Sequence, residues 1–348
     1  MMNNYIFDFT LSDLENLVLS WGEPEYRAIQ IWEGLYQQYW DDPQEFTTFP
    51  LELREKLKDT FIFRHLEPVD QVQSQDQKTK KVLFRLPDRS PIETVLMRDQ
   101  NRNTVCISSQ SGCALGCDFC ATGQMGFQRD LTSGEIVEQV VHFARILNTH
   151  QERLTNVVFM GMGEPFLNYQ AVMEAVQRLQ HNQGMNLGAR RFTISTVGIV
   201  PKIHRFAREK TQINLAISLH AVDDEIRSSM MPINQRYPVS DLISACKEYI
   251  SLTNRRITFE WALIQGVNDS PEQAKDLAPL LKGMLAHVNI IPLNPTEGYS
   301  GTSTRQERVK VFQSILLDQG ITCTVRKPRG IDIQAGCGQL ASQIDLMY

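Results

Sequence analysis

The sequence predicts an α/β protein: a partial (β/α)6 barrel that follows an N-terminal helical domain and a small β region. Three observations favour this class. Strand-like and helix-like runs alternate from about residue 103 onward, residues 1–65 show helical periodicity, and residues 66–102 show strand-like alternation. Such alternation is typical of a parallel sheet with helical crossovers. Six units fall short of the eight that close a full barrel, and a doubly wound open sheet is the alternative.

Residues 1–65 are expected to form a helical accessory domain. Ser12 and Glu15 have the spacing of a capping box before an apolar stretch. Apolar side chains then recur at helical spacing, at Ala28, Ile31, Trp32, Leu35 and Tyr39. We expect these aromatic side chains to pack in a core.

Residues 66–102 are expected to form a β-hairpin linker, because KKVLFRLPDRSPIETVLM predicts two strands around a Pro-Asp turn. The barrel domain is expected to span residues 103–348. Each of its six units begins with a strand-like run and continues with a helix-like one. The strand-like runs are NTVCISS, TNVVFMGM, RRFTISTVG, INLAISLHA, RITFEWALIQG and HVNIIPLNP.

Composition favours a cytoplasmic protein without a membrane partner. The chain has 348 residues, of which 42% are hydrophobic and 22% are charged, as is ordinary for a globular protein. No apolar run approaches the roughly 18 residues of a membrane span, and the acidic N-terminus does not resemble a signal peptide. In the cytoplasm the seven cysteines should stay reduced unless they bind metal or take part in catalysis.

The net charge of −5 does not by itself indicate a nucleic-acid-binding protein. Phosphates meet a local patch, however, and not the bulk charge. Basic residues do form clusters in the sequence. Each cluster could be a solvated strand or loop end, or a patch that contacts phosphate. The clusters are Lys78, Lys80 and Lys81; Arg190 and Arg191; Arg255 and Arg256; and Arg326, Lys327 and Arg329.

Polar residues gather where the predicted strands end. In parallel α/β folds, ligands bind at the carboxyl ends of the strands. A cysteine-rich loop follows the first predicted strand, and the GMGEP stretch at 161–165 follows the second. Further polar residues end the later strands, namely Ser195, Ser218, His220 and Asn294. Together these residues predict one site on the rim of the barrel.

Cys113, Cys117 and Cys120 have the spacing C-x3-C-x2-C. Thiolates bind soft metals, and iron–sulfur clusters usually have four of them. Three thiolates can hold a cluster and leave one iron open, which implies chemistry at that iron. Zinc with Cys106 as a fourth ligand is the alternative, although zinc sites usually show paired C-x2-C motifs.

The cysteine motif, with Phe119 before its last cysteine, resembles the signature of radical S-adenosylmethionine enzymes. Several further stretches resemble the RlmN/Cfr family of RNA methyltransferases, from about Glu93 to the C-terminus. They are CATGQMGFQRDLTSGEIVEQV, GMGEPFLN, SLHA, GVNDS, PLNP and RGIDIQAGCGQL. GEPEYRAIQIWEGLY resembles the family's helical accessory domain. Two positions depart from the pattern: Asp130 replaces a common Asn, and Gly336 replaces a common Ala, which would loosen the backbone beside Cys337.

The resemblance implies a [4Fe-4S] cluster on Cys113, Cys117 and Cys120, and two molecules of S-adenosylmethionine per turnover. It also implies which residues bind S-adenosylmethionine, with Gly163 and Glu164 at its methionyl part. The full set is Gly163, Glu164, Ser195, Ser218, His220 and Asn294.

The resemblance further implies a methyl relay through two cysteines. Cys337 takes a methyl group from one S-adenosylmethionine, and a radical from a second removes a hydrogen from that methyl. The carbon radical adds to adenine, and Glu93 accepts the ring proton. Cys106 then attacks the sulfur of Cys337, forms a transient disulfide and releases the base. From the residues alone, Cys106 resembles a core residue of a strand, and Cys337 resembles a free thiol flanked by glycine.

The implied substrate is C2 of an adenosine in 23S ribosomal RNA, at the peptidyl-transferase centre, and of an adenosine next to the anticodon in transfer RNA. The GEP triplet followed by Leu167 and Asn168 favours C2 over C8. The implied electron donor is a flavodoxin or a ferredoxin, and we expect a monomer. A C8-specific enzyme, a radical enzyme acting on a substrate other than RNA, and an iron–sulfur regulatory module are the alternatives.

Overall fold

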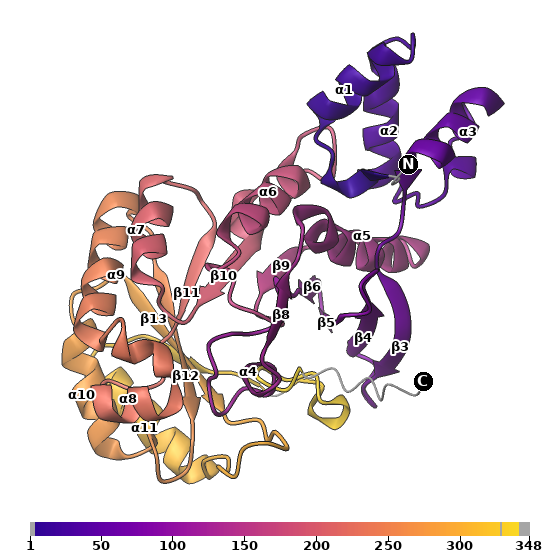
Figure 1. The fold of residues 1–348 in the computed structure, drawn as a ribbon. Coiled ribbons are helices and arrows are strands. Elements are labelled where there is room, and N and C mark those ends of the chain that lie inside the picture. The colour runs from indigo at the N-terminus through magenta and orange to yellow at the C-terminus, as the bar shows by residue number, and fades with distance from the viewer. Residues whose placement is uncertain (1–3, 328, 341–348) are drawn as a thin grey trace.

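The computed structural model of this chain describes residues 4–327 and 329–340. Within these residues ten strands form one sheet, in the order β14-β13-β12-β11-β10-β9-β6-β5-β4-β3. Figure 1 shows this sheet curving through the molecule, with the long helices packed on its outside and the N-terminal helices above it. The order does not close on itself, so the barrel is open.

Seven of the ten strands are parallel and follow chain order. They are β6 (Arg102–Cys106), β9 (Asn156–Phe159), β10 (Phe192–Thr196), β11 (Asn214–Ser218), β12 (Ile257–Leu263), β13 (Ala286–Pro292) and β14 (Cys323–Val325). A doubly wound sheet would reverse its strand order at a switch point, and this order does not reverse. The prediction of a partial barrel is therefore confirmed.

The crossover helices lie between these strands in sequence. They are α5 (Ser133–Thr149), α6 (Tyr169–Gln180), α7 (Val200–Arg208), α8 (Asp224–Met230), α9 (Val239–Thr253), α10 (Pro271–Leu281) and α11 (Gln306–Asp318). Helix α5 shows why such segments form helices. Thr132 and Glu135 form a capping box at its start. Ile136, Val140 and Phe143 then recur on one face and are buried against the sheet.

The linker region has one strand more than the sequence predicted. Strands β3 (Glu67–Gln73), β4 (Thr79–Arg85) and β5 (Pro91–Asp99) are antiparallel, and β5 pairs with β6 of the barrel. In this register Lys81 lies opposite Val95, and Val95 lies opposite Cys106. Opposite residues share a face of a sheet, as do residues two apart in one strand. One face of the sheet therefore carries Lys81, Glu93 and Cys106.

The N-terminal segment contains β1 (Asn4–Tyr5), η1 (Ile6–Asp8), α1 (Leu11–Ser20), α2 (Tyr26–Tyr36), η2 (Pro43–Glu45), α3 (Leu51–Thr60) and β2 (Phe61–Ile62). The predicted cap at Ser12 is wrong. Thr10 and Asp13 form the capping box, because the same spacing of polar residues occurs two positions earlier. Four of the five predicted apolar positions are buried in α2, whereas Tyr39 lies beyond the helix and is half-buried.

The remaining short elements lie in the connections between these strands and helices or, for η5, after β14. They are β7 (Gln110–Gly112), α4 (Ala121–Gln124), β8 (Phe127–Asp130), η3 (Ala189–Arg191), η4 (Pro232–Gln235) and η5 (Ile331–Ile333). Strands β7 and β8 pair with each other and bring the two ends of the cysteine loop together. None of the described helices has the length and apolar character needed to span a membrane.

Candidate active site

The cysteine loop is closed by the β7–β8 hairpin. The N–H of Cys113 donates to the carbonyl of Gly126 at 3.0 Å, and the N–H of Cys120 donates to the carbonyl of Cys117 at 3.1 Å. Gly112 has φ +72°, and a Cβ there would lie 1.9 Å from the carbonyl oxygen of Gly126. Only glycine fits this approach, so the hairpin fixes where the loop begins.

The three loop thiols are close enough to interact electrostatically. Burial raises the pKa of Cys113 to about 12 and raises the pKa values of Cys117 and Cys120 as well. The pKa of Cys117 is raised further by its charge interactions with Cys120 and Cys113. Within the described ranges, no three His, Cys, Asp or Glu side chains converge on one point as ligands of a single ion do. Soft thiolates are the donor type that an iron–sulfur cluster takes.

A pocket of about 170 Å³ lies at the carboxyl ends of β9 to β13, beside Cys117 and Cys120. We call it the strand-end pocket. It is lined by every residue that the sequence predicted for the cofactor, namely Gly163, Glu164, Ser195, Ser218, His220 and Asn294. The structure therefore brings together six residues from four different strand ends, as a parallel sheet does.

Gly163 and Glu164 form one wall of the strand-end pocket. Gly163 has φ +94°, and a Cβ there would lie 2.5 Å from the Cβ of Gln110. The carboxylate of Glu164 accepts the N–H groups of Phe166 and Val197, each at 2.9 Å. Burial raises the pKa of Glu164 to about 7. A buried carboxylate of this kind is suited to bind an amino group.

His220 presents a neutral imidazole to the same pocket. Its Nδ1 accepts the N–H of Ala262 at 2.9 Å, which assigns the proton to Nε2. Burial lowers the pKa of His220 to about 3, so the ring stays uncharged near neutral pH. Phe119 packs edge-on against it, with 5.0 Å between ring centroids. The aromatic residue of the cysteine motif thus contacts this histidine.

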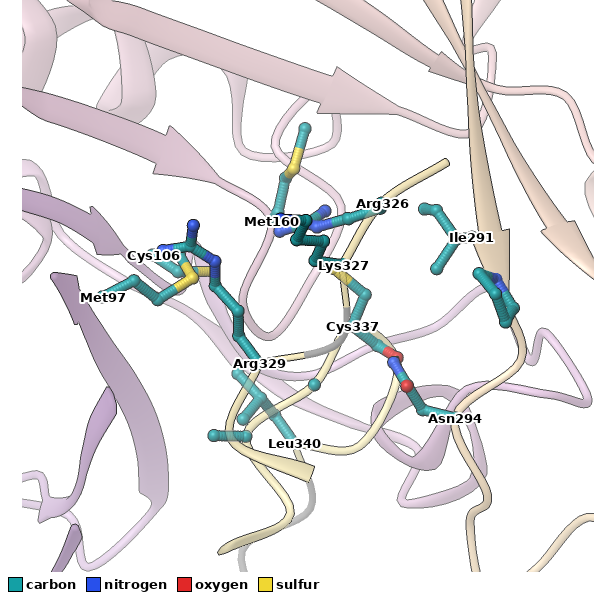
Figure 2. A pocket seen from close by; sticks show the side chains of 13 residues that line it. Met97, Cys106, Met160, Ile291, Asn294, Arg326, Lys327, Arg329, Cys337 and Leu340 are labelled. Atoms are coloured by element: carbon teal, nitrogen blue, oxygen red, sulfur yellow. The ribbon is translucent and has the colours of Figure 1, made fainter. Parts of the chain in front are cut away.

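Cys106 and Cys337 line a second, smaller pocket, which we call the cysteine pocket (Figure 2). Figure 2 shows Cys106 on β6 beside Met97, and Cys337 on the C-terminal segment above Asn294. Cys337 also lines the strand-end pocket. The thiol expected to carry a methyl group therefore lies where the two pockets meet, and the two predicted cysteines share one pocket despite 230 intervening residues.

The segment from Cys337 to Leu340, which we call the tail, is held by hydrogen bonds to the cysteine loop and to the segment after β13. The contacts within the described residues are Ala121 N–H to Gly338 O at 2.8 Å, Thr122 Oγ1 to Leu340 O at 2.6 Å, Asn294 Nδ2 to Cys337 O at 3.0 Å, and Gln339 Nε2 to Pro295 O at 2.9 Å. Asn294 therefore positions the backbone of Cys337.

Gly336 and Asp130, the two departures from the family pattern, both have structural roles. A Cβ at Gly336 would lie 2.7 Å from Asn294 Nδ2 and from Gln339 Oε1. This close packing, and not a loosened backbone, is what the glycine provides here. Asp130 accepts a hydrogen bond from Gln110 Nε2 at 2.7 Å, across the β7–β8 pair.

Arg326 is a site residue that the sequence did not single out. It follows β14, is half-buried, and lines both pockets. Cys337 raises the pKa of Arg326, as do Glu260 and Cys106. Burial raises the pKa of Cys106 to about 12, and Arg326 opposes this effect. In the sequence Arg326 belongs to a basic cluster that fits either a solvated strand end or a phosphate-binding patch. Its place directly after a strand is the only sequence signal for a role in the site.

Glu93 lines neither of these two pockets. It is buried on β5, and its carboxylate pairs with Lys81 Nζ at 2.8 Å. It faces a wide pocket of about 920 Å³, which Gln334 and Gln339 also line. Glu93 is therefore on the same face of the sheet as Cys106 but in the adjoining, larger opening.

All seven cysteines lie in the described residues, and all are free thiols. A standing disulfide between Cys106 and Cys337 is therefore not supported, and the transient disulfide that the resemblance implies would form only during turnover. Cys246 and Cys323 are buried in the core, as predicted.

Comparison with known proteins agrees with this geometry. Residues 107–278 match the model of the radical SAM superfamily, and residues 4–63 match the ribosomal RNA large subunit methyltransferase N-terminal domain. A probable dual-specificity RNA methyltransferase RlmN from Chloroflexus aurantiacus is 49% identical, over 99% of this chain and 94% of that protein. The chain belongs to the RlmN family. It is thus a radical SAM RNA methyltransferase by family.

Two further relatives give the same result. Dual-specificity RNA methyltransferase RlmN 1 from Myxococcus xanthus is 47% identical, over 98% of this chain and 95% of that protein. A crystal structure of a radical SAM methyltransferase from Sphaerobacter thermophilus superposes with a TM-score of 0.95 and 50% identity, covering 97% of this chain and 98% of that one. Membership in the radical SAM superfamily implies that the cofactors are a [4Fe-4S] cluster and S-adenosylmethionine. The three cysteines are therefore expected to bind iron, and the alternative of a zinc site is set aside.

Proposed function

We propose that this protein methylates C2 of an adenosine at the peptidyl-transferase centre of 23S ribosomal RNA, and C2 of an adenosine next to the anticodon in transfer RNA. The observation that carries the proposal is the place of Cys337, at the junction of the strand-end pocket and the cysteine pocket. A thiol there can receive a group from a molecule in one pocket and be attacked by Cys106 from the other.

In this proposal Cys113, Cys117 and Cys120 would hold the cluster. The strand-end pocket would hold S-adenosylmethionine, and the carboxylate of Glu164 would bind its amino group. When bound, the two cofactors supply the methyl group and the radical chemistry that joins it to an electron-poor ring carbon, with two molecules of S-adenosylmethionine used per turnover. A flavodoxin or ferredoxin supplies the electron.

The chain's own residues carry the remaining steps. Cys337 accepts the methyl group as a thiolate, and the guanidinium of Arg326, whose pKa is raised by Cys337, stays charged in the same pocket. Glu93 accepts the proton that leaves the adenine ring. Cys106 attacks the sulfur of Cys337 and releases the base. Arg326 also lowers the cost of ionising Cys106, so one cation serves both thiols.

The wide pocket is large enough for a nucleotide. Its volume of about 920 Å³ lies at the upper end of the roughly 300–1,000 Å³ usual for small-molecule sites. Glu93 is buried in its wall, beside the tail that carries Cys337. In this proposal the target nucleotide enters here, and the helical domain at residues 1–65 contacts the rest of the RNA.

The test is mass spectrometry of ribosomal and transfer RNA from cells with and without this gene. We expect 2-methyladenosine in both RNAs only when the gene is present. Peptide mapping of the purified protein should find the methyl group on Cys337, and Cys337→Ala should yield no methylated RNA. An 8-methyladenosine product, or a methyl group found only on Cys106, would contradict the proposal.

A further inference from the structure

A buried ion pair joins the linker sheet at the proposed proton-accepting residue. Lys81 Nζ lies 2.8 Å from Glu93 Oε1, and only 12% and 5% of the two side chains are exposed. The residues lie on the neighbouring strands β4 and β5, on the sheet face that also carries Cys106. A buried ion pair is weak evidence for stability, because desolvation offsets its attraction. Its location at a site is therefore the more informative fact.

The other charged residues that line the wide pocket, within the described part of the chain, are all acidic. Asp70 on β3, Glu297 after β13 and Asp332 on η5 line the same wide pocket. Like charges favour the protonated form of a carboxylic acid, and an adjacent cation favours the carboxylate. Among the described residues that line this pocket, Lys81 is the only cation. Lys81 is thus the cation of this pocket that pairs with Glu93.

Lys81 makes a second contact, with the segment that leads into the tail. Its Nζ donates to the carbonyl oxygen of Gln334 at 3.2 Å. Gln334 has φ +51° and stands three residues before Cys337. On the same segment Asp332 accepts the N–H of Gln75 at 2.8 Å. One ammonium group therefore contacts both the carboxylate on the sheet and the chain that presents the thiol.

We propose that Lys81 is a positioning residue for the proton transfer. It holds Glu93 as a carboxylate at the wall of the wide pocket and fixes the distance between that carboxylate and the segment bearing Cys337. The identity of the transferred proton rests on the proposed function. The effect of Lys81 on the charge of Glu93 does not, and it can be measured without turnover.

The first experiment titrates Glu93 directly. The full-length protein is labelled with 13C at the glutamate side-chain carboxyl, and the Glu93 signal is identified as the one missing in Glu93→Gln. In Lys81→Met we expect the titration midpoint of this signal to rise by about one to three pH units, whereas Lys81→Arg should retain the wild-type midpoint within about half a unit. Lys80→Met is the matched control, because Lys80 neighbours Lys81 on β4 but faces the opposite side of the sheet.

The second experiment measures RNA methylation between pH 6 and pH 9. Because Glu93 must be ionised to accept a proton, Lys81→Met should lose activity at low pH and regain it as pH rises, with its profile displaced in the same direction as the titration. Thermal melting and iron content identify any variant that fails to fold. A midpoint unchanged in Lys81→Met, or raised equally in Lys80→Met, would overturn the inference. If no variant, including wild type, methylates RNA, the proposed function fails while the titration still decides the role of Lys81.

Discussion

Replacing Cys106 by Ala separates a chemical role from a packing role. The side chain is 8% exposed and lies on β6 between Val95 and Val158 of the neighbouring strands. The substitution removes one buried sulfur, which is similar in size to a methylene group. It should cost about 1 kcal/mol of stability, or about 2 °C in Tm for a chain of this size. A packing role predicts this loss and nothing more.

The chemical role predicts a much larger effect on one step. Burial raises the pKa of Cys106 to about 12, so about one molecule in 10,000 has the thiolate at pH 8. Release in the wild type should therefore accelerate about tenfold for each pH unit between pH 7 and pH 9. In Cys106→Ala this route is absent. Methyl loading of Cys337 and addition to adenine should proceed, and a covalent protein–RNA species should accumulate to about one per active chain.

The assay is a single-turnover reaction followed on a denaturing gel. The adduct should appear as a slow band that nuclease treatment shrinks, with a mass that maps to Cys337. Cys337→Ala is the matched control, because it removes the carrier and should give neither adduct nor product. The reasoning is refuted if Cys106→Ala turns over at the wild-type rate, or if it loses stability and activity without any adduct.

Three further outcomes follow from the site. Replacing Cys113, Cys117 or Cys120 with Ala should abolish the visible absorption and the roughly four irons per chain of anoxically purified protein; retained iron or stoichiometric zinc would contradict the assignment. Burial raises the pKa of Glu164 from 4.5 to about 7, so the folded state binds this proton more tightly, and the stabilisation present below about pH 4.5 is lost as pH rises through 7. Melting of the cofactor-free protein should show this loss, and the loss should be smaller in Glu164→Gln; an equal loss in both proteins would exclude Glu164 as its source. RNA binding should weaken as salt rises despite the net charge of −5, and an affinity unaffected by salt would argue against contacts with phosphate.

The barrel and most of the site could be predicted because their signals are local. The alternation of strand and helix is written along the chain, and the carboxyl ends of parallel strands must meet at one rim. Glu164, His220 and Asn294 therefore fall into one pocket without any knowledge of distances. The cysteine motif is equally local, because its spacing alone places three thiols on one loop.

The contacts that depend on register and burial could not be predicted. Arg326 and Lys81 look like ordinary basic residues in the sequence. Only the fold shows that Arg326 interacts with two thiols and that Lys81 pairs with the carboxylate of Glu93. The third linker strand was missed because its residues, Glu67–Gln73, are mostly exposed and carry no apolar alternation. The helix cap was predicted at Ser12 but is formed by Thr10, because the overlapping pairs Ser12–Glu15 and Thr10–Asp13 both have the spacing of a capping box. Only the backbone conformation selects between them.

The hydrogen bonds of the tail have a consequence for how an active molecule matures. Two of the contacts described above come from Ala121 and Thr122, which directly follow the last cysteine of the loop. If the loop is not folded, the tail loses these partners, and Cys337 is left to Asn294 and to Gln339, which itself belongs to the tail. The position of the acceptor thiol is therefore coupled to the folding of the cysteine loop. A chain whose loop is not yet folded holds its acceptor thiol through fewer contacts than the finished molecule does.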